Sequence, residues 1–386
     1  MLFDKLLLLS EGKTCYYGSL TQLRPYMKAQ GNPIPLNTNP AEFLLELTNT
    51  DFQGGVSSGP TTLEEITSYW TASPEAKQLS KQHSQDARDT LSSEVPKFQS
   101  RGSFLPVALA LLHRSFIKSY RDVVAYGIRF AMYMGLALMM GTVWLRLPAS
   151  QSSIQPFVNA LFFGGAFISF MAVAYVPAFL EDRATFVKER ANGLYGATAF
   201  LLSNLLIGIP YLFLIALLFS IPSYYLINFR AGASAFWTYV LWLFLDLLAA
   251  ESLVVLISSL FPNFVIALAL TAFANGLWMS VGGFLVSPEV LNVFWRYVFH
   301  YIDYQAYVFR AMMANEFGDR TYACGAGCRC MYDSALAGKC EIDGRAVLQE
   351  YGYRQDGNGG KWVGIMLAIM VVYRLLGWVV LMMKRT

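Results

Sequence analysis

The stretch that decides the fold is residues 191–229, ANGLYGATAFLLSNLLIGIPYLFLIALLFSIPSYYLINF, which contains no Asp, Glu, Lys or Arg. A helix needs roughly 20 mostly apolar residues to cross a bilayer. Two other uncharged runs of sufficient length are Leu147–Leu180 and Ser252–Pro288. Three further apolar stretches are interrupted only by isolated charges. We therefore expect six membrane spans, at about 123–145, 156–180, 198–221, 235–260, 263–286 and 362–383.

The composition supports an integral membrane protein. Of 386 residues, 55% are hydrophobic and only 14% are charged, whereas an ordinary soluble domain carries about 25% charged residues. Disordered and collagen-like chains are excluded, and a net charge of +3 is too small to indicate a nucleic-acid partner. A soluble protein with buried helices would need a polar face on each helix, and these segments have none.

The distribution of Lys and Arg predicts the orientation, because cytosolic loops are enriched in both. Basic residues precede the first expected span, lie in the segment 181–197 and follow the last span. The short loops after the first and third spans hold one Arg each. We expect a multi-pass protein with both termini in the cytosol and with residues 287–361 outside.

The first hundred residues differ in character from the rest. Residues 1–50 predict a strand over 3–9, a turn at 10–13, a second short strand at 16–18 and a helix over 21–30. So small a piece cannot bury a sound core alone, which indicates the remnant of a larger domain. Residues 51–103 are interpreted as a cytosolic linker. Gly12-Lys13-Thr14 resembles the end of a phosphate-binding loop, but the required earlier glycine is absent.

Residues 104–122 have an apolar stripe and a basic stripe at helical spacing. This pattern predicts an amphipathic helix on the inner membrane surface. The alternative is a helix that packs on the N-terminal piece.

Four charged residues fall inside the expected spans, where charge is costly and usually paired. At 1.5 Å per residue from the cytosolic ends, Arg129 lies about 9 Å deep, Glu251 about 13 Å, Arg374 about 15 Å and Asp246 about 21 Å. We hypothesise that Glu251 pairs with Arg374 or Arg129, either to hold the helices together or to serve transport. Asp246 has no evident cation, so it is either protonated or faces water.

The external segment is rich in aromatic residues between 294 and 309, which predicts short re-entrant or surface helices. It also contains four cysteines, Cys324, Cys328, Cys330 and Cys340. An even number outside the cell indicates two disulfides, and a Cys328–Cys330 bridge is disfavoured by its geometry. Zinc binding is the alternative. Cys15 is expected to be reduced.

Several short motifs, taken in order, resemble the G subfamily of ATP-binding-cassette (ABC) half transporters, the white and pleiotropic-drug-resistance type. Phe3-Asp4-Lys5-Leu6, followed by Ser10-Glu11-Gly12, is similar to the end of that family's nucleotide-binding domain. Asn39-Pro40-Ala41-Glu42-Phe43 resembles the element that follows it. Gly141-Thr142-Val143-Trp144 and Asn315-Glu316-Phe317 resemble the end of the first span and a motif of the last external loop.

The resemblance implies an all-α exporter domain with six transmembrane helices, a short cytosolic remnant and a disulfide-containing external loop. It implies a coupling helix that includes Glu181, Arg183, Lys188, Glu189 and Arg190. It further implies a homo- or heterodimer in contact with membrane lipid, whose substrate cavity is lined by Phe163, Phe167, Asn275 and Trp278. The substrates would be hydrophobic or amphipathic, such as drugs, lipids or sterols, and the location would be the plasma membrane.

The family's ATP-binding motifs are missing, so this chain should bind no cofactor itself. ATP and Mg²⁺ would act through a complete nucleotide-binding domain. We expect that this domain has been truncated away, the alternative being supply by another chain. Two other functions stay open, namely a motor-less six-span channel or membrane enzyme, and a truncated dimer partner that does not transport.

Overall fold

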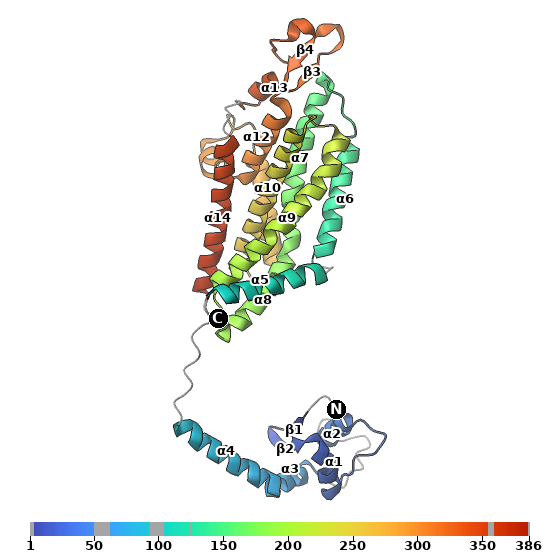
Figure 1. The fold of residues 1–386 in the computed structure, drawn as a ribbon, viewed down its shortest axis with the longest axis vertical. Coiled ribbons are helices and arrows are strands. Elements are labelled where there is room, and N and C mark those ends of the chain that lie inside the picture. Colours follow the sequence, from blue (N-terminus) through green and yellow to red (C-terminus); the bar gives the residue numbers. More distant parts are fainter. Residues whose placement is uncertain (1–3, 50–61, 93–103, 123–125, 354–358, 385–386) are drawn as a thin grey trace. The chain divides into compact units, whose positions relative to one another are not determined.

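The computed structural model describes residues 4–49, 62–92, 104–122, 126–353 and 359–384. The chain forms two compact units, Met1–Ser100 and Arg101–Thr386, and we describe each by itself (Figure 1).

The first unit is a small α+β structure. Strands β1 (Lys5–Ser10) and β2 (Lys13–Ser19) pair antiparallel. Both turn residues between them, Glu11 and Gly12, have positive φ, as a tight hairpin requires. Helix α1 (Leu20–Ala29) follows, and Gly31, with φ of 91°, ends it. The predicted strand, turn, strand and helix are confirmed.

The core of this unit also takes residues from the expected linker. Helices α2 (Pro40–Thr48), α3 (Leu63–Ala72) and α4 (Pro74–Ser92) complete the unit. Ile66 and Trp70 of α3 are buried beside Tyr16 and Tyr26. The described part of residues 51–103 thus contributes to the core as well as connecting the two units.

The second unit is helical apart from one small hairpin. Its long helices are α5 (Phe104–Arg121), α6 (Ile128–Val143), α7 (Ile154–Phe170), α8 (Val176–Ala191), α9 (Ala197–Ile227), α10 (Ala233–Leu260), α11 (Phe264–Val281) and α14 (Gly359–Met383). Among the described residues, five helical segments are long and apolar enough to cross a membrane. The expected span 123–145 corresponds to α6, which has only 16 residues in its α-helical part, and part of that span lies outside the described residues.

The expected second span continues directly into the charged segment that follows it. A 3₁₀ segment, Met171–Tyr175, joins α7 to α8, and Pro177 occupies the first turn of α8. Proline is tolerated there because the first turn has no internal partner for its N–H. The predicted coupling helix is therefore the end of a nearly continuous helical run, joined to the span without a loop.

Helix α10 lies at the centre of the bundle and is the most deeply buried of the long helices. It packs against α7, α8, α9, α11, α12 and α14 (Figure 1). Both intramembrane acids of the sequence, Asp246 and Glu251, belong to this helix. A residue of α10 consequently faces protein on almost every side.

The external segment folds over the end of the bundle. A π-helix (Trp295–His300) and α12 (Tyr304–Phe317) confirm the expected short helices. Beyond them β3 (Thr321–Ala323) pairs with β4 (Glu341–Asp343), and α13 (Gly344–Glu350) follows. Cys324 lies beside Cys330 and Cys328 beside Cys340, with Cα atoms 4.7 and 4.8 Å apart.

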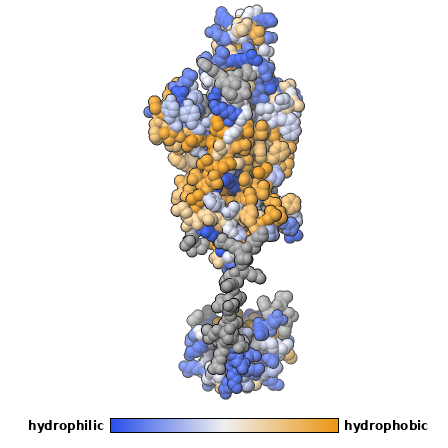
Figure 2. Space-filling model, turned by 60° about the vertical axis from the view of Figure 1, so that its left-hand side comes forward, coloured by the Kyte–Doolittle hydropathy of each residue, from blue (hydrophilic) through white to orange (hydrophobic). Residues whose placement is uncertain are grey.

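The surface of the second unit fits a membrane environment. Figure 2 shows a broad hydrophobic band over the helices and a hydrophilic end formed by the hairpin. The helix expected over 104–122 is present as α5, and its exposed apolar side chains are Phe104, Leu105, Leu109, Phe116 and Tyr120. Its place on the inner membrane surface stays a prediction.

The close contact between α13 and α12 gives a first prediction. A Cβ on Gly344 would overlap the carbonyl oxygen of Phe317 and lie 2.8 Å from that of Arg320. We predict that Gly344→Ala destabilises the external segment by about 1–3 kcal/mol, which a thermal-unfolding assay of the purified chain can measure. Gly338→Ala is the matched control because nothing lies within 4 Å of its Cβ. Equal stability of the two variants would contradict this packing.

Candidate functional site

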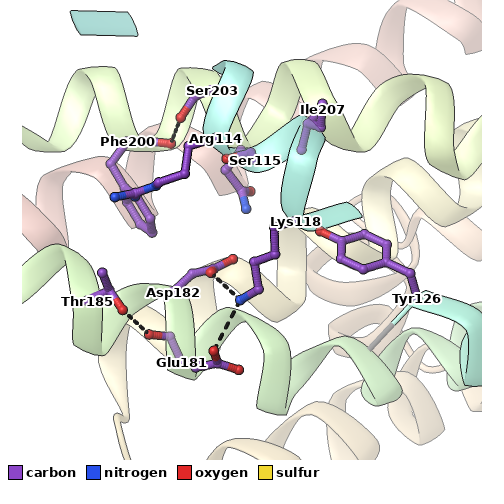
Figure 3. Close-up of a pocket in the computed structure, with 11 residues that line it drawn as sticks. Arg114, Ser115, Lys118, Tyr126, Glu181, Asp182, Thr185, Phe200, Ser203 and Ile207 are labelled. Atoms are coloured by element: carbon purple, nitrogen blue, oxygen red, sulfur yellow. Dashed lines mark hydrogen bonds and ion pairs between the residues drawn. The ribbon is translucent and has the colours of Figure 1, made fainter. Parts of the chain in front are cut away.

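A polar pocket of about 210 Å³ lies between α5, α8 and α9. Figure 3 shows Lys118 and Arg114 of α5 on one side and Glu181 and Asp182 of α8 on the other. Asn204 of α9 also lines the pocket. The pocket thus brings the amphipathic helix, the expected coupling helix and a membrane span to one place.

Ion pairs hold α5 to α8. Lys118 Nζ lies 2.8 Å from Asp182 Oδ1 and 3.4 Å from Glu181 Oε1. Partial burial disfavours the charge of Lys118, but hydrogen bonds and attraction from the two carboxylates outweigh it and raise the pKa of Lys118. The Lys118–Asp182 pair is partly shielded from solvent, so it is screened less than an exposed pair, whereas Glu181 is exposed.

A second clamp joins the same helices, one turn earlier on α5 and about two turns later on α8. Arg114 Nη1 lies 2.6 Å from Glu189 Oε1, and the hydroxyl of Tyr195 donates to the other oxygen of Glu189. Arg190 donates to the backbone carbonyls of Leu381 and Met382. Those carbonyls belong to the last turn of α14, where a cation is favourable.

The two remaining residues of the expected coupling set make no such bond. Lys188 is exposed, and Nε of Arg183 is buried without a hydrogen-bond partner. The partners of α8 on α5, Arg114 and Lys118, were interpreted from the sequence only as the basic face of a surface helix. Their pairing with α8 depends on tertiary packing and has no local signal.

Deeper in the bundle, Glu251 forms an ion pair with Arg129. Both side chains are at least 96% buried, and the Arg129 guanidinium also lies over the rings of Tyr175 and Tyr211, 5.0 and 5.1 Å from their centres. Of the two partners expected for Glu251, the structure provides Arg129. Aromatic faces and one carboxylate together compensate the buried cation.

Arg374 binds neutral groups in place of an acid. Its Nε donates to Ser252 Oγ at 3.1 Å and its Nη1 to Asn204 Oδ1 at 2.8 Å. Asn204 in turn donates to the hydroxyl of Tyr175 at 2.6 Å. Asn204 also lines the pocket beside the α5–α8 clamp, and Tyr175 contacts Arg129, so hydrogen bonds and ring contacts run from the pocket wall to the centre of the bundle.

The residues expected to line a cavity lie on α7 and α11, two helices that contact each other. Phe163 and Phe167 of α7 are half-buried and stack with ring centres 5.6 Å apart. Asn275 of α11 is fully buried and accepts a 2.7 Å hydrogen bond from Tyr304, and Trp278 is buried on the same face. The exposed side of α11 instead carries an apolar groove of about 540 Å³ that includes Phe273 and Leu277.

Within the described residues, no group of three or more His, Cys, Asp or Glu side chains could hold a metal. The four external cysteines lie in two pairs at disulfide distance. Cys15 in the first unit is buried and unpaired.

Comparison with known proteins agrees with this architecture. Residues 107–317 match the family model of the ABC-2 type transporter. ABC transporter G family member 1 of Petunia hybrida is 30% identical, over 97% of this chain and 58% of the relative. ABC transporter G family member 11 of Arabidopsis thaliana is 28% identical, over 98% of this chain and 56% of the relative. The chain thus spans under three-fifths of the length of these relatives.

These matches, with the helical bundle and its apolar surface, define an integral membrane protein of the ABC-2 transporter class. The chain belongs to the G subfamily of ABC transporters and contains its transmembrane domain.

The buried ion pair gives a second prediction. Arg129→Ala leaves Glu251 buried without its cation, which should cost about 3–5 kcal/mol of stability. Exchanging the charges, Arg129→Glu with Glu251→Arg, should recover part of this loss. Thermal unfolding of the purified variants measures both effects.

The exchange with Arg374 is the control. Arg374→Glu with Glu251→Arg should recover nothing, because Arg374 binds Ser252 and Asn204. Recovery in this pair and not in the first would show that Glu251 pairs with Arg374.

Proposed function

We propose that this chain is the membrane part of an ATP-driven exporter of hydrophobic or amphipathic molecules, of the drug, lipid or sterol class. The observation that carries the proposal is the double clamp between α5 and α8. The clamp borders a pocket that Asn204, the hydrogen-bond partner of Arg374, also lines. Such a connection would let a nucleotide-binding domain that pushes on α8 change the positions of the membrane helices.

The mechanical step follows from the continuity of α7 and α8. A force on α8 acts directly on α7, because only one 3₁₀ segment lies between them. The clamps carry the force to α5, and Arg190 carries it to the end of α14. In this proposal a nucleotide-binding domain pushes on α8, and ATP binding and hydrolysis alternate the access of the cavity. In this proposal ATP and Mg²⁺ bind to that domain.

The transporter would act as a homo- or heterodimer in the plasma membrane, with both termini in the cytosol. Helix α6 would be the first span in chain order and would bring the number of spans to six. Phe163 and Phe167 would offer aromatic surface to substrate, together with the apolar groove on α11. Asn275 and Trp278 would support this surface from the buried face of α11, beside Tyr304.

A transport assay tests the proposal. With a nucleotide-binding domain present, in one chain or as a partner, inside-out vesicles should take up an amphipathic fluorescent substrate only when ATP is supplied. Lys118→Ala should reduce the amount of substrate taken up per ATP hydrolysed several-fold, because α8 loses one of its links to α5. Arg121→Ala is the matched control, because Arg121 is an exposed cation at the end of the same helix.

Reversing the pair, with Lys118→Asp and Asp182→Lys, should restore coupling. Unchanged uptake in Lys118→Ala would disprove the role of the clamp, and uptake that needs no ATP would disprove the exporter.

We further propose that Cys324–Cys330 and Cys328–Cys340 are disulfides on the outside of the cell. Peptide mapping without reductant should recover these two linkages. An impermeant thiol reagent should label the four cysteines of intact cells only after reduction. Linkage of Cys324 to Cys328, or labelling only after the cells are opened, would contradict the proposal.

A further inference from the structure

A small cavity lies between α7, α10 and α12. Its volume is about 10 Å³, and its polar lining consists of Asp246 and Gln305. Gly165 of α7 forms part of the wall, and the rest is apolar. A space of roughly this size holds one water molecule if polar partners surround it.

Three polar atoms at this cavity lack a hydrogen bond. They are Oδ1 of Asp246 and both atoms of the Gln305 side-chain amide, all buried. The other oxygen of Asp246 accepts a 2.6 Å hydrogen bond from Ser169. Leaving a buried polar atom unpaired costs about 1–3 kcal/mol. Three such atoms around one small space indicate that something polar occupies it.

Asp246 also lacks a cation. Its side chain is completely buried, and it forms no ion pair with any residue that the structure describes. Two cations predicted to lie in the spans have other partners, since Arg129 is paired with Glu251 and Arg374 binds Ser252 and Asn204. An unpaired buried carboxylate would cost several kcal/mol, whereas a neutral carboxylic acid both donates and accepts hydrogen bonds.

We propose that this cavity is an occluded water site and that Asp246 faces it as a neutral carboxylic acid. The acid O–H donates to the water, and the water donates to Oε1 of Gln305. Together with the bond from Ser169, this arrangement joins α7, α10 and α12 through one buried centre. Divalent cations need six or more oxygen ligands, which these side chains do not supply.

The site has a structural consequence for α12. This helix is too short to cross a bilayer, and Gln305 lies in its first turn, beside the capping residue Asp303. The water bridge fixes the start of α12 to the central helix α10. The external segment should therefore move with α10 as one body.

Infrared spectroscopy of the purified chain in lipid nanodiscs tests the assignment of the proton. The spectrum of the wild type at neutral pH should contain a carboxylic-acid carbonyl band that Asp246→Asn removes. Asparagine accepts from Ser169 through its oxygen and donates to the water through its amide, so the variant should keep the wild-type melting temperature. Asp246→Leu, which can do neither, should lose several degrees.

Filling the cavity tests the water. A Cβ on Gly165 would lie 4.0 Å from Asp246 Oδ2 and 3.8 Å from Val308, without a clash. Gly165→Ala should displace the water and shift the Asp246 band to that of a more weakly bonded acid. Gly164→Ala is the control, because its Cβ would contact Tyr239 and Met140 instead, and it should leave the band in place.

Three results would overturn the proposal. Absence of the Asp246 band shows an ionised carboxylate, and an unshifted band in Gly165→Ala shows a dry cavity. A melting temperature that rises when sodium replaces choline in the wild type, but not in Asp246→Asn, shows a monovalent cation site.

Discussion

The structure depends on one constraint, which is that the hydrocarbon interior of a bilayer offers polar groups no water. This chain places its intramembrane acids on α10, the helix with the most protein neighbours. Each then meets a partner from another helix, Glu251 through Arg129 of α6 and Asp246 through Ser169 of α7. Arg374 reaches α10 and α9 from the opposite side. The polar groups thus specify which helices are neighbours, while the apolar surface holds the bundle in the membrane.

At the end of the bundle that carries α5 and α8, the side chains are partly exposed and their pairs are ionic clamps. Lys118 and Arg114 bind α8 at two points eight residues or less apart along it. Two contacts on one helix resist both sliding and rotation, which a single pair does not. Only a 3₁₀ segment separates α8 from α7. The clamped helix α8 and the helices that hold the buried polar residues are therefore structurally continuous within the second unit.

Much of this could be predicted from particular residues. The apolar runs located the long helices, because a chain that must hide its backbone polar groups in lipid can do so only as a helix. The local patterns also gave the hairpin, α1, α5 and the helices of the external segment. The orientation of α11, that is, which of its faces is buried, was harder to predict. Nothing in a uniformly apolar helix indicates which side meets α12, so the hydrogen bond between Asn275 and Tyr304 could not be predicted.

The sequence by itself determined the class of protein, the approximate spans and the residues that need partners, because hydrophobic length and isolated charge are local properties. Only the tertiary structure decided which partners they find. Arg129 and Arg374 are both arginines within predicted spans, yet one binds Glu251 and the other Asn204 and Ser252. That choice depends on how α6, α9 and α14 are rotated and packed around α10. A single sequence does not predict contacts between residues more than a hundred positions apart, because no local pattern encodes them.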